Sequence, residues 1–163
     1  MKNTSYIVAA LLLTLLVGCA QQNPTTHAVL GLKESAAIHE LADLPENPLL
    51  LHGITSRIQP KDGTLSTLYG NTIAYDYAHT KGAGNYPAGA VLYYVTWQSE
   101  ADKQWFGANV PALIKTVEQV KFTNENKVQY ALYDRNSKRE SEISSSEMRI
   151  NLIKNMKIAT FVK

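Results

Sequence analysis

The amino-acid sequence predicts an α+β protein in which an antiparallel β-sheet packs against a few helices. Short helical patterns are interspersed with strand patterns, and the strands are joined by hairpin-type loops, not by helical crossovers. Residues 90–98 are largely apolar or aromatic on both alternating faces, which predicts a central strand covered on both sides. The chain has 163 residues, 45% of them hydrophobic, which is enough for one core.

The first 18 residues have the pattern of a secretory signal. Lys2 gives a positive start, and residues 7–17 are almost wholly apolar. Eleven helical residues rise about 16 Å, which is too short to cross a bilayer core of roughly 30 Å. We therefore expect residues 1–18 to be a signal peptide and not a membrane span.

This signal ends in Leu16-Val17-Gly18-Cys19, which resembles the lipobox of bacterial lipoproteins. The resemblance implies cleavage before Cys19 and lipidation of its sulfur and new amino group, and several acyl chains anchor a protein stably. Ala20 stands where an aspartate would favour the inner membrane, which implies the outer membrane, facing the periplasm. The alternative is an uncleaved signal with a free Cys19. We expect three regions: a signal at 1–18, a lipid anchor and tether at 19–32, and a single domain at 33–163.

The first part of this domain is expected to hold a short helix and then a strand. Apolar residues recur at helical spacing over 33–44, and Pro45 and Pro48 end the pattern. Residues 60–63 read Pro-Lys-Asp-Gly, a turn in which proline presets φ and glycine tolerates positive φ. A short strand is predicted over 64–69.

The middle of the chain predicts a helix followed by the best strand. Asn71 is a suitable N-cap for a helix that runs to about Thr80. Residues 81–89 carry three glycines and a proline, and we expect a loop there. In the strand at 90–98, one face would carry Val91, Tyr93, Val95 and Trp97, and the other Leu92, Tyr94 and Thr96.

The last third predicts a hairpin, a helix and a final strand. Residues 99–104 read as a polar loop, and residues 114–122 alternate like a strand, with a helix from Pro111 as the alternative. A loop at 123–126 joins this strand to another at 128–133. Ser144 and Glu147 form a capping box for a helix that ends near Asn155, and 158–162 reads as a strand.

Composition excludes several classes of site. The net charge of +2 is too small to predict a nucleic-acid partner, because such binding neutralises many phosphates. A single cysteine cannot form an internal disulfide, a CxxCH haem attachment, a CxxC redox pair or a multi-cysteine zinc site. No GxSxG, SxxK or phosphate-binding glycine loop is present, so nothing in the pattern favours an enzyme.

The remaining candidates are histidines and aromatic residues. The four histidines have no metal-ligand spacing, and each is more often a surface or hydrogen-bonded residue than a ligand. His52 stands out because it follows an apolar run, and His79 ends the helix expected after Asn71. Tyr93, Tyr94 and Trp97 are candidates to line a pocket, although aromatic residues in a strand more often belong to the core.

An ordered set of segments resembles the cytochrome P-460 family. It comprises Gly63-Thr64-Leu65-Ser66-Thr67-Leu68-Tyr69-Gly70-Asn71, Ala74, Tyr86-Pro87-Ala88-Gly89-Ala90-Val91-Leu92, Val95-Thr96-Trp97, Trp105-Phe106-Gly107-Ala108 and Val117-Glu118. The resemblance spans roughly residues 50–163. It implies a periplasmic, often dimeric domain of antiparallel sheet and helices around a c-type haem, in enzymes that oxidise hydroxylamine or bind nitric oxide.

The chain departs from this family at every haem-binding position. Residues 136–148, where the family has CxxCH, hold no Cys and no His, and Tyr94 stands where the enzymes cross-link a lysine to haem. We therefore expect no cofactor and a haem-free module that binds a small ligand or a protein partner, with a homodimer as an implied assembly. The alternative that the resemblance implies is a non-covalent haem protein, with His52 or His79 as the iron ligand, that handles nitric oxide or hydroxylamine-type species.

Overall fold

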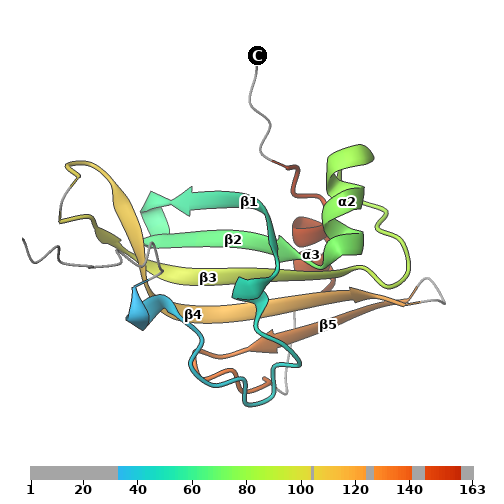
Figure 1. Cartoon of the computed structure of the whole chain (residues 1–163), viewed down its shortest axis with the longest axis horizontal. Coiled ribbons are helices and arrows are strands. Elements are labelled where there is room, and N and C mark those ends of the chain that lie inside the picture. Colours follow the sequence, from blue (N-terminus) through green and yellow to red (C-terminus); the bar gives the residue numbers. More distant parts are fainter. Residues whose placement is uncertain (1–32, 104, 124–126, 141–145, 159–163) are drawn as a thin grey trace, which may run out of the picture. The chain divides into compact units, whose positions relative to one another are not determined.

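The computed structural model describes residues 33–103, 105–123, 127–140 and 146–158. Leu32–Lys163 form one compact unit. Its centre is a five-stranded antiparallel sheet in which the strands lie side by side in chain order, β1-β2-β3-β4-β5 (Figure 1). The α+β class and the antiparallel sheet predicted from sequence are confirmed.

All neighbouring strands are antiparallel, and β3 lies at the centre. The strands are β1 (His52–Gln59), β2 (Thr64–Gly70), β3 (Val91–Ala101), β4 (Asn109–Phe122) and β5 (Val128–Tyr133). Val91, Tyr93, Val95 and Trp97 pack on one face of β3, and Leu92 and Tyr94 pack on the other, as predicted.

Two helices cover one end of one sheet face. Helix α2 (Thr72–Thr80) follows β2, and the side chain of Asn71 caps it by accepting from the Ala74 amide at 3.0 Å. Helix α3 (Ser146–Lys154) follows β5 and contributes the buried Ile153. None of the helices in the described part of the chain is long and apolar enough to cross a membrane.

The face beneath these helices holds one core. Small helix residues allow α2 to approach the sheet closely, since Ala74 and Ala78 are buried in the same cluster as Leu68 and Leu92 of the sheet. The buried members are Ile54, Leu68, Ala74, Ala78, Tyr86, Ala90, Leu92, Tyr94, Val120, Phe122 and Ile153.

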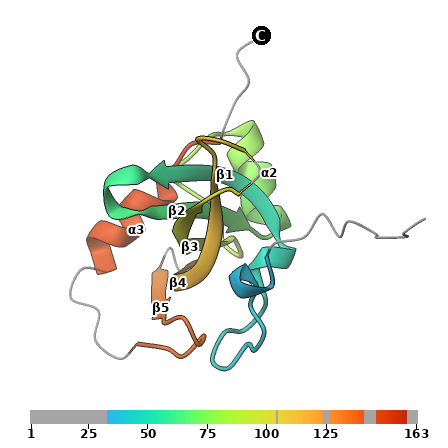
Figure 2. The ribbon, with the colours of Figure 1, turned by 90° about the vertical axis from the view of Figure 1, so that its left-hand side faces the viewer.

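The opposite face holds a second core, which an irregular N-terminal segment covers (Figure 2). The predicted helix at 33–44 is wrong: only the 3-10 helix η2 (Glu34–Ala36) forms, and the chain then runs irregularly. Its anchors are spread out, since Ala36 and Leu44 are both buried and the Asp43 amide donates to Ser137 after β5. Burial of these anchors against the sheet decides the path of the segment and overrides its local helical propensity.

The strands on either side of residue 104 are longer than the sequence predicts. The polar loop expected from residue 99 is wrong at its start, because β3 continues to Ala101. The segment predicted as a strand over 114–122 belongs to β4, and the alternative helix from Pro111 does not form. Strand β1 was not predicted. Ile158 is not in a strand, and 159–162, Ser144 and 124–126 lie outside the described residues.

Candidate ligand-binding cavity

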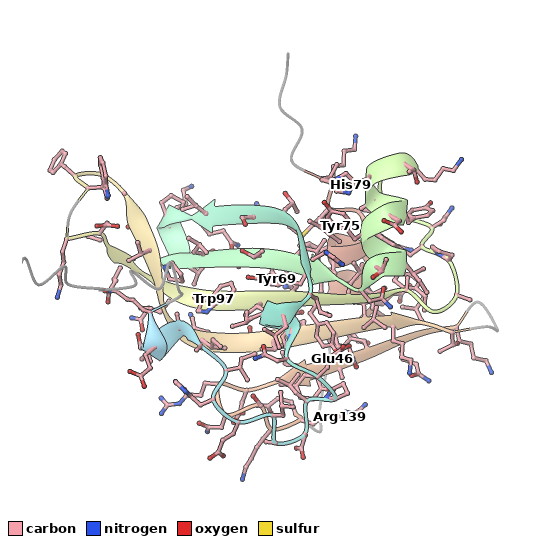
Figure 3. All side chains as sticks on the ribbon, in the orientation of Figure 1. Glu46, Tyr69, Tyr75, His79, Trp97 and Arg139 are labelled. Carbon is pink, nitrogen blue, oxygen red and sulfur yellow. The ribbon has the colours of Figure 1, made fainter. Side chains whose placement is uncertain are left out.

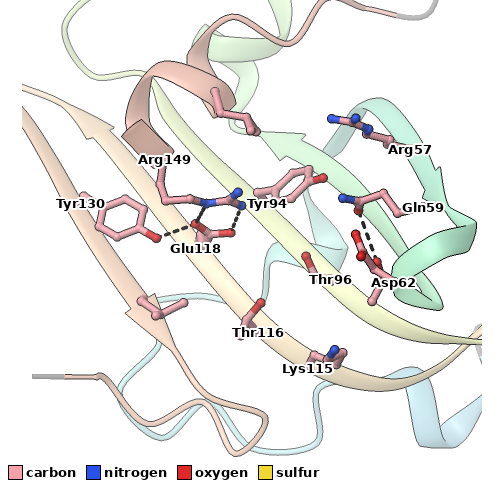
Figure 4. A pocket seen from close by; sticks show the side chains of 13 residues that line it. Arg57, Gln59, Asp62, Tyr94, Thr96, Lys115, Thr116, Glu118, Tyr130 and Arg149 are labelled. Atoms are coloured by element: carbon pink, nitrogen blue, oxygen red, sulfur yellow. Dashed lines mark hydrogen bonds and ion pairs between the residues drawn. The ribbon is translucent and has the colours of Figure 1, made fainter. Parts of the chain in front are cut away.

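A polar cavity of about 410 Å³ lies on the sheet face that carries α3, over strands β1 to β5 (Figure 4). Residues from all five strands, from α3 and from the β1–β2 turn line it. They are Arg57, Gln59, Asp62, Thr64, Tyr94, Thr96, Lys115, Thr116, Glu118, Tyr130, Leu132, Arg149 and Leu152. A cavity of this size suits a small molecule.

The floor of this cavity is built by strand register. Arg57, Ser66, Thr96 and Thr116 are successive neighbours across β1 to β4 and therefore share one face. The hydroxyls of Ser66 and Thr96 are hydrogen-bonded at 3.1 Å. On the same face, the paired residues Leu92 and Val120 are apolar, whereas the pair Thr96 and Thr116, further along the same strands, carries hydroxyls.

A buried ion pair forms one wall. Glu118 is only 4% exposed, and Arg149 on α3 donates to it from Nε at 2.7 Å and from Nη2 at 2.5 Å. The hydroxyl of Tyr130 donates to the same carboxylate at 2.5 Å. The bidentate guanidinium and the tyrosine hydroxyl together satisfy the Glu118 carboxylate, whose charge would otherwise be costly to bury.

The same contacts shift the pKa values of the two donors. Hydrogen bonding to Glu118 raises the pKa of Arg149 despite its partial burial. Burial, and then the hydrogen bond to Glu118, raises the pKa of the Tyr130 hydroxyl well above 10. At neutral pH the arginine is therefore charged and the tyrosine is a neutral donor. Arg149 also lies 5.7 Å from the centre of the Tyr94 ring.

Two further cations line the cavity without an ion pair among the described residues. Arg57 on β1 and Lys115 on β4 are exposed. The pairing passes from Thr96–Thr116 to Trp97–Ile114, which leaves Lys115 as the extra residue of a β-bulge. With Glu118 balancing Arg149, the lining carries Arg57 and Lys115 against the single carboxylate of Asp62.

The three aromatic residues predicted to line a pocket lie on two different faces of the sheet. Tyr94 lines the cavity, at 3% exposure. Tyr93 and Trp97 lie in the core of the opposite face, where Trp97 meets Tyr69 edge to face (Figure 3). The Tyr93 hydroxyl donates to Glu46 at 3.1 Å and accepts from Gln119 at 2.6 Å, so both residues have structural partners there.

The two candidate haem ligands lie against one tyrosine outside the cavity. The ring centres of His52 and His79 are 4.8 and 4.1 Å from that of Tyr75, and His79 Nδ1 is 3.1 Å from the Tyr75 carbonyl oxygen (Figure 3). Both histidines are exposed, and neither lines the cavity next to Glu118 or the hollow beside His39. Within the described residues, no cluster of three or more His, Cys, Asp or Glu could hold a metal.

A second hollow of about 440 Å³ lies between the segment that follows η2 and the turn after β5. His39 lines it, and its Nε2 is 2.8 Å from the Glu34 carbonyl oxygen. No charged residue in its lining is buried, whereas Glu118 is buried in the first cavity. The first cavity is therefore the better built polar site.

Sequence reasoning missed the charged residues of this cavity. Glu118 had a signal, because it stands in β4 where alternation predicts a face shared with Val120 and Phe122, and a carboxylate on such a face needs a partner. Nothing in the sequence assigns that partner to Arg149, which lies 31 residues further along.

In comparisons with known proteins, no family model and no curated protein matches the chain. The resemblance to the cytochrome P-460 family therefore stays a prediction from sequence.

Proposed function

We propose that this protein is an outer-membrane lipoprotein whose periplasmic domain binds a small, acidic, hydroxyl-bearing ligand in the cavity next to Glu118. The observation that carries the proposal is the polar end of the sheet face, where a buried ion pair and a row of hydroxyls replace the apolar core. We further propose that the domain is a haem-free relative of the cytochrome P-460 family. The α+β class of the domain, with its antiparallel sheet and two helices, supports this proposal.

The anchor is tested at Cys19. We expect Cys19→Ser to prevent lipidation and to move the protein from the outer-membrane fraction to the soluble periplasmic fraction, because the acyl chains supply the membrane affinity. Fractionation and immunoblotting measure this. The control is Ser35→Ala, a substitution of another small polar residue, which should leave the protein in the membrane. A Cys19→Ser protein that still sediments with outer membranes contradicts the lipoprotein proposal.

The ligand class follows from the charges and the hydroxyls. Arg57 and Lys115 would attract one carboxylate or phosphate, since they lack ion-pair partners among the described residues. Thr96 and Thr116 can donate to and accept from the hydroxyls of the same molecule. A monosaccharide-sized acid combines these groups and suits a cavity of about 410 Å³.

The experiment is calorimetric titration of the full lipoprotein in detergent with glucuronate, glucose 6-phosphate and neutral glucose. We expect the two acids to bind at least tenfold more tightly than glucose, because only they carry an anionic group that can pair with Arg57 and Lys115. Arg57→Ala and Lys115→Ala should each weaken acid binding roughly fivefold to tenfold.

Lys121→Ala is the matched control, because Lys121 is an exposed lysine of the same strand outside the cavity lining. Equal binding of glucose and glucuronate, or the same loss in the Lys121→Ala control, would overturn the acidic-ligand proposal. A haemin titration of the same sample tests the alternative: a saturating Soret shift at one equivalent, lost in His52→Ala or His79→Ala, would favour the haem protein.

A further inference from the structure

The hairpin between β3 and β4 ends in two exposed aromatic side chains. Trp105 is 71% exposed and Phe106 is fully exposed, although aromatic side chains of this size are usually buried in part. We call residues 99–103 and 105–111 the arm. The last pairing of β3 with β2 is Gln98 with Thr64, and beyond it β3 pairs only with β4. The arm therefore projects past the rest of the sheet (Figure 1).

The tip of the arm has a defined backbone. The Ala108 amide donates to the Trp105 carbonyl at 3.1 Å, and Gly107 has φ +82°, as expected at the third position of a type II turn. The Trp105 amide donates to the Asp102 carboxylate at 3.2 Å, and the Asp102 amide donates to the Ala108 carbonyl at 2.9 Å. These bonds hold the two aromatic residues in an exposed position, so inserting them into another phase needs little ordering of the chain.

The start of the described chain is fixed beside the base of the arm. Lys33 forms an ion pair with Glu100, one residue before the end of β3. The indole of Trp97 donates to the Ala36 carbonyl at 2.9 Å, which fixes the next turn of the segment to the same strand. The tether expected over residues 19–32 therefore joins the domain at the end of the sheet where the arm projects.

We propose that Trp105 and Phe106 insert into the interfacial region of the lipid leaflet that holds the acyl chains of Cys19. This inference rests on the proposed lipid anchor. Lys33 follows Cys19 by 14 residues, a length of chain that cannot place Lys33 more than about 50 Å from the lipidated cysteine. The arm tip is thus held near the bilayer at a high effective concentration, where even a weak insertion is populated.

The chemistry of the tip favours lipid over a protein partner. Tryptophan is enriched at the membrane–water interface, where its ring and N–H meet both phases. Lys103, which is exposed beside the pair, can approach anionic headgroups. Two side chains on a narrow turn offer far less area than the roughly 800 Å² per partner of a stable protein interface.

Tryptophan fluorescence tests the proposal, because the chain has only two tryptophans and Trp97 is buried at 1% exposure. The full lipoprotein is reconstituted in phosphatidylethanolamine–phosphatidylglycerol vesicles, with or without lipids brominated near the headgroup end of the acyl chains. In Trp97→Phe protein, Trp105 is the only tryptophan. We expect its emission to shift to the blue in vesicles and brominated lipids to quench it roughly twofold.

Two further variants complete the design. Trp105→Phe protein contains Trp97 as its single tryptophan, and its fluorescence should not be quenched. If Trp97→Phe protein folds poorly, the Trp105 signal is obtained by subtracting the Trp105→Phe fluorescence from that of the wild type. Phe106→Ser in the Trp97→Phe background keeps the anchor and should reduce the quenching.

The outcomes separate the two proposals. Protein that floats with the vesicles but whose Trp105 is not quenched overturns the insertion and leaves the anchor intact. Protein that does not float overturns the anchor. Quenching that disappears when the protein is diluted within the bilayer would instead mean that the arm binds a second copy, which also overturns the insertion.

Discussion

Replacing Trp97 by alanine is expected to lower the free energy of unfolding by about 3–5 kcal/mol. Trp97 is 1% exposed, and its ring packs between β3 and the segment at 34–51 in the second core. Its indole N–H donates to the Ala36 carbonyl at 2.9 Å, so the variant also leaves that carbonyl without its donor. The measurement is chemical denaturation of the full chain in detergent, followed by circular dichroism.

The chain provides its own control for this substitution. Trp105→Ala removes the same side chain from an exposed turn, and it should change the free energy of unfolding by less than about 0.5 kcal/mol. A matching small loss in Trp97→Ala would mean that the tryptophan does not hold the N-terminal segment on the sheet. The contrast between the two variants therefore tests the second core directly.

The parts of the fold that the sequence predicts are those in which one periodicity or one cap decides the outcome. Strand β3 carries apolar residues on both faces, and it lies at the centre with Trp97 and Tyr94 on opposite sides. Asn71 caps α2 because its side chain can bind a free amide at the helix start. These features depend on neighbouring residues only.

Other parts depend on contacts that the local pattern does not contain. The bulge at Lys115 puts Ile114 in the core on the face opposite to Val120, so simple alternation assigns Ile114 to the wrong side. It also leaves Lys115 among the residues that line the cavity. The segment at 33–44 has helical spacing but covers a sheet face, and the second core decides its path.

The cavity was the hardest feature to foresee, because its defining pair joins β4 to α3. Of the site candidates that the sequence predicts by residue type, His52, His79, Tyr93, Tyr94 and Trp97, only Tyr94 lines the cavity. The residues that shape it include two arginines, a glutamate, a lysine and three threonines, which are residue types common on any surface. Their arrangement becomes a site only when strand register places them on one face.

Replacing Arg149 by methionine is expected to lower the free energy of unfolding by about 2–4 kcal/mol. This loss is smaller than that expected from breaking a wholly buried ion pair, because the Arg149 side chain is 31% exposed. The variant leaves the buried Glu118 carboxylate with Tyr130 as its side-chain donor among the described residues. Methionine keeps much of the length of the side chain, so the loss reports the missing charge and hydrogen bonds more than missing volume. Denaturant titration of the full chain measures it.

A double variant tells whether this loss comes from the uncompensated carboxylate. Glu118→Met together with Arg149→Met removes both charges, and it should recover most of the stability lost in Arg149→Met, because apolar side chains of similar size replace a buried pair at little net loss. Arg135→Met, at an exposed position in the turn after β5, should change stability by less than about 0.5 kcal/mol. If the double variant is no more stable than Arg149→Met, the arginine stabilises α3 by packing on Tyr94, and the carboxylate is solvated without it.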